Sequence, residues 1–276
     1  MTWTAWERVS GFDFTDLVYE KKYLDTGGGV ARITINRPEV LNAFTGHTID
    51  EMGIAFDDAS NDPLIGVVVL TGAGDKAFSA GGDVKWEATG ATRRSFQTGF
   101  VLNNYLRACR KPIIAAVKGY AIGGGHHLAY CCDFTIAADN AVFGQNGPRV
   151  GSPADGWVVS YLTRVVGAKK AREIWMLCRR YNAKEALEMG LANKVVPLGE
   201  LEEEVDRWCE ELLALSPTCI EILKATFDIE FDYMRGTFGR ITPMIAPDFI
   251  GSPECTEAQQ AFFEKRKPSF WQFRKR

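Results

Sequence analysis

The sequence lacks the features that place proteins in membranes, in the secretory pathway or on nucleic acids. No apolar run reaches the roughly 18 residues that a membrane span needs. Residues 1–7 have neither the basic nor the apolar region of a secretory signal. The formal net charge of -3 provides no general basic face for nucleic acid. We therefore expect a soluble, cytoplasmic protein with no membrane or nucleic-acid partner.

Cysteine is present but lacks the spacing of a structural site. The chain has seven cysteines, an odd number, and no pair is arranged as CxxC. This pattern favours reduced thiols in a cytoplasmic enzyme over a disulfide framework or a zinc site. We predict no metal centre.

The 276 residues, 46% of them hydrophobic, suffice for a full core in one large domain or two. Residues 1–16 form an extension with aromatic side chains and no clear period, and we assign it no secondary structure. Residues 18–23 and 30–35 predict a β-hairpin joined by a glycine turn.

Residues 17–200 alternate strands, glycine turns and helices, which predicts an α/β core of stacked layers. Residues 66–71 and 113–117 are β-branched, apolar runs typical of buried strands. From Gly151 onward strands largely disappear, and residues 201–276 are predicted to form a helical C-terminal region that mediates assembly. The predicted helices are 47–59, 157–166, 168–179, 183–189, 200–214 and 217–231.

Gly123, Gly124 and Gly125 stand between a predicted strand and a predicted helix. Without Cβ atoms the backbone can turn tightly there, and another group can approach it closely. The first N–H groups of the helix have no partner within it, and its dipole adds partial positive charge. An oxygen that acquires negative charge would be held at this turn. The alternative is a turn whose glycines only let the helix and the sheet pack closely.

A second glycine turn, Ser79-Ala80-Gly81-Gly82-Asp83, follows the preceding predicted strand. If the two turns lie side by side, two backbone N–H groups converge and form an oxyanion hole. Such a site holds a thioester carbonyl as it becomes an enolate, and each donor is typically worth roughly 2.7–4 kcal/mol.

Several motifs in one order resemble the crotonase (enoyl-CoA hydratase/isomerase) superfamily, over about residues 17–270. The resemblance implies a spiral of ββα units with a helical C-terminal region, trimers that often pair into hexamers, and coenzyme A thioester substrates. The motifs are Asn36-Arg37-Pro38 with Leu41-Asn42-Ala43, Ala77 to Asp83, Gly119 to Gly125, Cys132-Asp133-Phe134 and Phe143-Gly144-Gln145.

The resemblance also implies site residues. It places the oxyanion N–H groups at Gly82 and Gly124. The basic stretch with Lys265 and Lys267 is either a solvated tail or a contact to a phosphate of coenzyme A. The other implied substrate or coenzyme A contacts are Val40, Leu41, Ala43, Ser79, Ala80, Gly123, Gln145 and Gly147.

Within the superfamily, residues 144–152 and 169–175 resemble two ring enzymes, ketocyclohexanecarboxyl-CoA hydrolase and dihydroxynaphthoyl-CoA synthase. The chain also departs from its relatives. The positions of the two hydratase glutamates hold His127 and Gly147, which disfavours addition of water to a double bond. The aspartate of the ring enzymes corresponds to Ala154, and the acid stands one place later as Asp155. Their C-terminal tyrosine is missing, because that stretch reads Phe249-Ile250.

Three residues are therefore candidates for acid–base work, each with a structural alternative. Asp155 is either a catalytic carboxylate or a helix N-cap worth about 1 kcal/mol. His127 either accepts a proton or holds a water, or it only begins a helix. Ser152 either donates a hydrogen bond to the substrate or caps the start of a helix. Asp83 is predicted to be structural, and residues 87–97 are predicted to form a mobile loop over the substrate.

These residues favour hydrolytic C–C ring opening of an alicyclic β-keto acyl-CoA, which needs one oxyanion hole and one base for water. The first alternative is a ring-forming condensation, with bicarbonate held near Gln145 and Gly147 as the base. An enoyl-CoA hydratase and a non-catalytic member that binds coenzyme A or RNA are the remaining alternatives. We expect no cofactor beyond the coenzyme A moiety of the substrate, with bicarbonate reserved for the ring-forming reaction.

Overall fold

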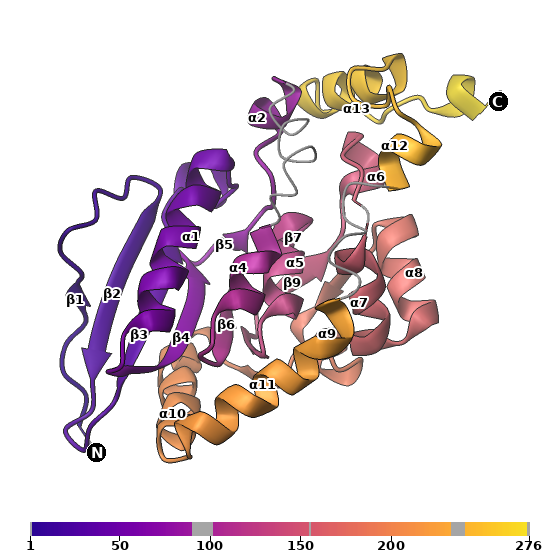
Figure 1. Cartoon of the computed structure of the whole chain (residues 1–276). Coiled ribbons are helices and arrows are strands. Elements are labelled where there is room, and N and C mark those ends of the chain that lie inside the picture. The colour runs from indigo at the N-terminus through magenta and orange to yellow at the C-terminus, as the bar shows by residue number, and fades with distance from the viewer. Residues whose placement is uncertain (1, 90–101, 155, 233–240, 275–276) are drawn as a thin grey trace.

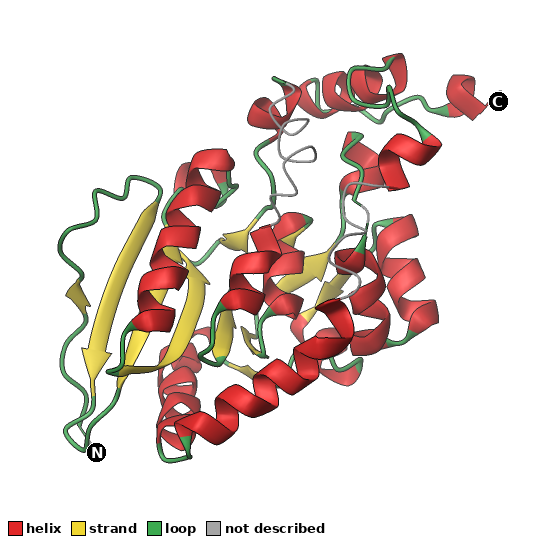
Figure 2. Ribbon diagram, viewed as in Figure 1, coloured by secondary structure: helices red, strands yellow, loops and turns green. Residues whose placement is uncertain are grey.

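The computed structural model describes residues 2–89, 102–154, 156–232 and 241–274, and within them strands form two sheets surrounded by helices (Figure 1). Figures 1 and 2 show β1 and β2 at one outer edge of the molecule and helices around the remaining strands. The strands are β1 (Glu7–Arg8), β2 (Leu17–Tyr23), β3 (Gly29–Ile35), β4 (Ile65–Gly72), β5 (Ala77–Ser79), β6 (Ile113–Val117), β7 (Tyr120–Ile122), β8 (Phe134–Ala138), β9 (Val142–Gly144), β10 (Arg180–Asn182) and β11 (Lys194–Val196). The α-helices are α1 (Gly46–Asn61), α2 (Val84–Ala88), α4 (Leu102–Ala108), α5 (Gly124–Cys131), α6 (Gly147–Val150), α7 (Trp157–Val166), α8 (Ala168–Leu177), α9 (Ala183–Glu188), α10 (Leu201–Leu213), α11 (Pro217–Asp232), α12 (Ile241–Ile245) and α13 (Pro253–Phe263).

The two sheets are built from a repeated unit. The large sheet has the order β1-β2-β3-β4-β6-β8-β11, and the small sheet has the order β10-β9-β7-β5. Each of the pairs β4–β5, β6–β7 and β8–β9 gives its first strand to the large sheet and its second to the small sheet. A helix, α2, α5 or α6 respectively, follows each pair. The predicted α/β core of ββα units is confirmed.

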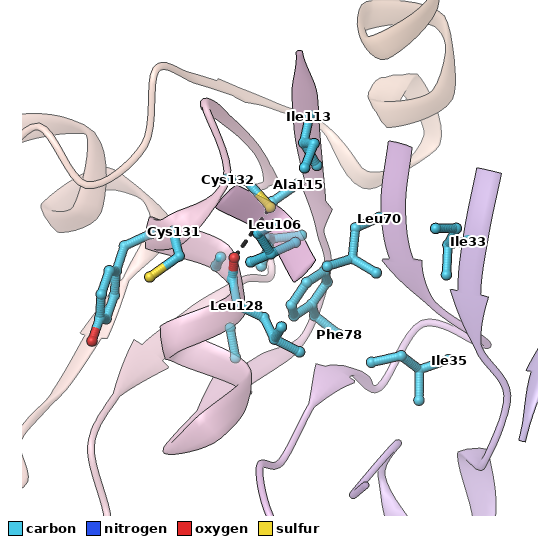
Figure 3. Packing of buried hydrophobic residues seen from close by; sticks show 14 of the residues in the cluster. Ile33, Ile35, Leu70, Phe78, Leu106, Ile113, Ala115, Leu128, Cys131 and Cys132 are labelled. Atoms are coloured by element: carbon cyan, nitrogen blue, oxygen red, sulfur yellow. Dashed lines mark hydrogen bonds between the residues drawn. The ribbon is translucent and has the colours of Figure 1, made fainter. Parts of the chain in front are cut away.

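The core lies on both faces of the large sheet. On one face, side chains of β3, β4 and β6 pack against α1 and α5. Figure 3 shows Leu70 of β4 and Phe78 of β5 directed toward Leu106 of α4 and Leu128 of α5. On the other face, Val67 and Ile114 pack against α10 through Val205. Because α10 completes this core, the boundary expected at residue 200 does not separate two cores. The role of residues 201–276 in assembly stays a prediction.

The predicted hairpin forms as β2 and β3, which pair antiparallel from Leu17↔Ile35 to Tyr23↔Gly29. The expectation that residues 1–16 carry no structure is wrong. β1 pairs with β2, and Trp3 bridges to Leu24. The Lys22 ammonium explains this, because it lies 4.6 Å from the Trp3 ring and 4.4 Å from the Trp6 ring and attracts both π-faces. Asp206 of α10 pairs with the same ammonium at 2.6 Å.

Most predicted helices are confirmed within a few residues. Helix α1 spans Gly46–Asn61 because Thr45 caps its start, accepting a hydrogen bond from the Thr48 N–H, and Met52 and Phe56 bury its apolar face. The C-terminal half also holds two strands that the sequence did not predict, β10 and β11. Each has only three residues, which is too short for a period to appear.

All seven cysteines are unpaired, six of them buried and Cys219 exposed. None of the helices in the described residues is long and apolar enough to cross a bilayer.

Helices α11 and α12 each carry exposed apolar side chains. Figure 1 shows α11 and α12 at the outside of the molecule. Phe227 of α11 is 74% exposed and Met244 of α12 is 78% exposed. Large exposed apolar patches on soluble proteins mark interaction surfaces. The other exposed apolar residues of these two helices are Ile222, Leu223, Ile229, Ile241 and Ile245.

We propose that these exposed side chains are covered by neighbouring subunits in a homotrimer or homohexamer. Replacing Phe227 by Glu places a charge in the contact, so we expect light scattering to report a smaller particle than for the wild type. Ile54→Glu is the matched control, because Ile54 is 50% exposed on α1 and lies outside these helices. A wild-type protein that scatters as a stable monomer would refute the proposal.

Candidate active site

The two glycine turns lie against each other. β5 and β7, which precede them, are parallel neighbours in the small sheet. A Cβ atom added to Gly81 would lie only 2.8 Å from the backbone nitrogen of Gly124, so the two backbones are in contact. Gly81 has a φ of +96° and Gly123 a φ of +56°, values that glycine adopts without the steric cost of other residues.

Phe44 fixes the first turn from outside. Its N–H donates to the Gly81 carbonyl at 2.9 Å, and its carbonyl accepts from the Asp83 N–H at 2.9 Å. The N–H of Gly82, between these two bonds, donates to no group in the described residues. Neither does the N–H of Gly124, which opens helix α5. Both glycines line one cavity of 690 Å³.

Buried polar side chains hold this geometry from behind. The Asn42 amide donates to the carbonyls of Ala73 and Ala77 at 2.9 and 2.7 Å. The Ser79 hydroxyl donates to the Asn42 carbonyl at 2.7 Å and accepts from the Gly81 N–H at 3.2 Å. Ser79 is fully buried and does not line the cavity, so its place is beneath the turn.

The cavity wall brings together most of the residues expected to contact substrate. Lys265 and Lys267 lie beyond the end of α13, are exposed and do not line the cavity, so their contact with a phosphate stays a prediction. The expected contact residues that do line it are Val40, Leu41, Ala43, Ala80, Gly123, Gln145 and Gly147.

His127 lines the cavity, and its ring lies 5.1 Å from that of Trp175. Burial lowers the pKa of His127 to about 4, opposed in part by an interaction with Gln145, so its imidazole is neutral at physiological pH. His126 points elsewhere: its Nδ1 lies 2.9 Å from the Gln145 amide nitrogen, and burial lowers its pKa to about 3.

The loop between β9 and α7 forms the opposite wall, with Gly147 and Ser152 lining the cavity. A Cβ atom at Gly147 would lie 2.5 Å from the carbonyl oxygen of Ser152, so the backbone there leaves no room for a side chain. Asp155 lies outside the described residues, as do residues 90–97 of the predicted loop over the substrate.

Asp83 has the structural role that the sequence predicts. It caps α2 by accepting from the Lys85 and Trp86 N–H groups at 3.0 and 3.4 Å. It also pairs with Arg37 at 3.3 Å.

Glu87 is a titratable cavity residue that the sequence analysis did not identify as a candidate. It lies on α2, lines the cavity and is half-buried. Burial raises its pKa, with a further contribution from the charge of Asp83, and an interaction with Ser152 offsets part of the rise. The only signal in the sequence was that Glu87 lies four residues after Asp83, which caps α2.

These features define a class: an α/β protein of stacked strand–strand–helix units in which two free backbone donors face one cavity. A family model described as enoyl-CoA hydratase/isomerase matches residues 25–274. The chain therefore belongs to the enoyl-CoA hydratase/isomerase family, the crotonase superfamily that the motifs indicated.

Solved structures agree with this assignment. An enoyl-CoA hydratase/isomerase from Xanthobacter autotrophicus Py2 is 33% identical with a TM-score of 0.77, covering 91% of this chain and 92% of that chain. An enoyl-CoA hydratase from Mycobacterium avium subsp. paratuberculosis K-10 is 28% identical with a TM-score of 0.76, covering 93% and 98%. A monofunctional enoyl CoA isomerase from M. smegmatis is 32% identical with a TM-score of 0.65, covering 79% and 94%. None of these three is described as a ring-opening or ring-forming enzyme.

The pair of free N–H groups can be tested by deleting one of them. We expect Gly124→Pro to lower turnover of an acyl-CoA substrate at least about a hundredfold, because proline has no N–H to donate. Gly124→Ala is the matched control. It keeps the N–H but adds a Cβ atom 2.3 Å from the Phe44 ring, so it reports the steric effect alone. Near-normal turnover by a folded Gly124→Pro variant would show that this N–H is not a donor to the substrate.

Proposed function

We propose that this protein is an acyl-CoA enzyme that holds a thioester oxygen between the N–H groups of Gly82 and Gly124 while an enolate forms. The observation that carries the proposal is that these two N–H groups face the same cavity with no acceptor in the described residues. A site with preorganised donors stabilises developing negative charge because the donors need no reorganisation during the reaction.

The acyl group would lie among apolar side chains of the cavity, including Ile122, Val158 and Trp175. Apolar walls exclude water from the enolate and strengthen its hydrogen bonds to the backbone. The exposed rim, with Val40 and Leu41, would leave the coenzyme A part of the substrate near solvent.

Addition of water across a double bond by two carboxylates fits the chain poorly. One glutamate position of the related hydratases holds His127, which is neutral above about pH 4. The other holds Gly147, where the Ser152 carbonyl would obstruct any side chain. Restoring a glutamate at residue 147 would therefore require the loop to move.

We propose hydrolytic C–C ring opening of an alicyclic β-keto acyl-CoA as the reaction. A base, Asp155 or His127, takes a proton from water as the water oxygen bonds to the ring ketone carbon. The resulting alkoxide re-forms a carbonyl and breaks the C–C bond, and the released electron pair moves onto the thioester oxygen between Gly82 and Gly124. The enolate then takes a proton at carbon. Neutral His127, packed on Trp175, can hold this water by accepting its hydrogen bond.

The reaction can be identified by mass spectrometry of products from a panel of cyclic keto-acyl-CoA and aryl-succinyl-CoA thioesters. Ring opening predicts a product that is heavier than its substrate by one water. We expect Asp155→Asn to lower this rate at least about a hundredfold, the usual contribution of a positioned general base. We expect removal of bicarbonate from the buffer to leave the rate unchanged.

The ring-forming alternative makes the opposite prediction. With bicarbonate beside Gly147 as the base, depletion of bicarbonate would stop the reaction, and Asp155→Asn would have little effect. That combination of results would refute ring opening and favour ring closure as the reaction of this protein.

A further inference from the structure

Glu87 is held in place by a short, well-anchored helix. Asp83 caps α2 and pairs with Arg37, and the Glu87 N–H donates to the Asp83 carbonyl at 2.8 Å. A side chain on such an anchored turn keeps its direction, which a catalytic group requires.

The carboxyl group of Glu87 lies directly beside one oxyanion donor. A Cβ atom on Gly82 would lie 2.1 Å from Glu87 Oε1 and 3.0 Å from its carboxyl carbon. The space that a side chain at residue 82 would fill is thus occupied by this carboxyl group. A thioester oxygen bonded to the Gly82 N–H would bring the neighbouring acyl carbons within reach of Glu87.

The surroundings of Glu87 favour its protonated form. Burial raises the pKa of its carboxyl group, and the negative charge of Asp83 raises this pKa further. Ser152, from the opposite wall, is the neutral group that interacts with it. The other titratable or charged side chains that line the cavity are Glu39, Lys85, Tyr120, His127, Arg180 and Cys255.

We propose that Glu87 is the catalytic acid that delivers a proton to the α-carbon of the enolate held by Gly82 and Gly124. This inference rests on the proposed function, to which it adds the group that completes the reaction. The Glu87 O–H bond breaks as the α-carbon forms its new C–H bond, and the enolate electron pair becomes that bond. The thioester carbonyl is restored, and the Glu87 carboxylate takes a proton from solvent before the next turnover. The proton removed from water by the separate base returns to solvent, so the cycle balances.

The test separates this step from water activation. By microscopic reversibility, Glu87 as a carboxylate also removes the α-proton of a straight-chain acyl-CoA thioester. That proton should then exchange with deuterium in heavy water, which mass spectrometry detects without any ring to open. We expect Glu87→Gln to slow this exchange at least about a hundredfold and to slow ring opening similarly, with KM little changed. Asp155→Asn should slow ring opening alone.

Glu203→Gln is the matched control, because Glu203 is exposed on α10 outside the cavity, and it should behave as wild type. If the wild type exchanges and Glu87→Gln exchanges equally fast, the role of Glu87 is refuted and the oxyanion site stands. If the wild type binds acyl-CoA thioesters but neither exchanges nor converts any of them, both this inference and the proposed function are overturned.

A second readout does not depend on activity. The native state raises the pKa of Glu87, so its ionisation costs native stability as the pH rises from the unfolded-state value of about 4.3 through the folded value. In urea unfolding, Glu87→Gln should therefore gain stability relative to wild type as the pH increases over this range. The difference between Glu203→Gln and wild type should not follow this course. A Glu87→Gln difference that is independent of pH would show that the carboxyl group is not held in its protonated form.

Discussion

The close approach of two backbones at Gly81 and Gly124 is the constraint on which the site depends. The distance of 2.8 Å between a Cβ atom at Gly81 and the Gly124 nitrogen leaves no room for any side chain there. The same constraint applies to the small sheet, because the two turns meet only if β5 and β7 are neighbouring strands. β7 pairs with β5 through a register shift between Ala77 and Ser79, which brings the end of β5 to the start of α5. The two-sheet arrangement is thus what turns two local motifs into one site.

Burial acts in the same sense on His127 and Glu87, two titratable groups of the cavity. It lowers the pKa of His127 and raises that of Glu87, so both favour their uncharged forms. In such a cavity the enolate oxygen would be the main charge to appear during the reaction.

The parts of the structure that the sequence predicted are those set by local pattern. The glycine turns, the β2–β3 hairpin and α1 depend on spacing and capping within about twenty residues, which a single sequence displays directly. Glu87 could not be recognised in this way. Its importance comes from its distance to Gly82, and that distance is produced by the cap at Asp83 and by a five-residue helix with no usable period. The strand β1 was missed for a similar reason, because Trp3 and Trp6, which lie before it, are held in part by Glu210 and Glu202 of α10, which are distant in the chain.

The contact between the N-terminal segment and α10 has a consequence for how the protein is made. The Trp3 indole donates to Glu210 at 2.9 Å across 207 residues, and the Trp6 indole donates to Glu202 at 2.9 Å across 196 residues. During synthesis from the N-terminus these acceptors do not exist until most of the chain has left the ribosome. The N-terminal segment that carries β1 therefore lacks these two hydrogen bonds for most of translation. Both acceptors become available only when α10, which carries Glu202 and Glu210, has been synthesised.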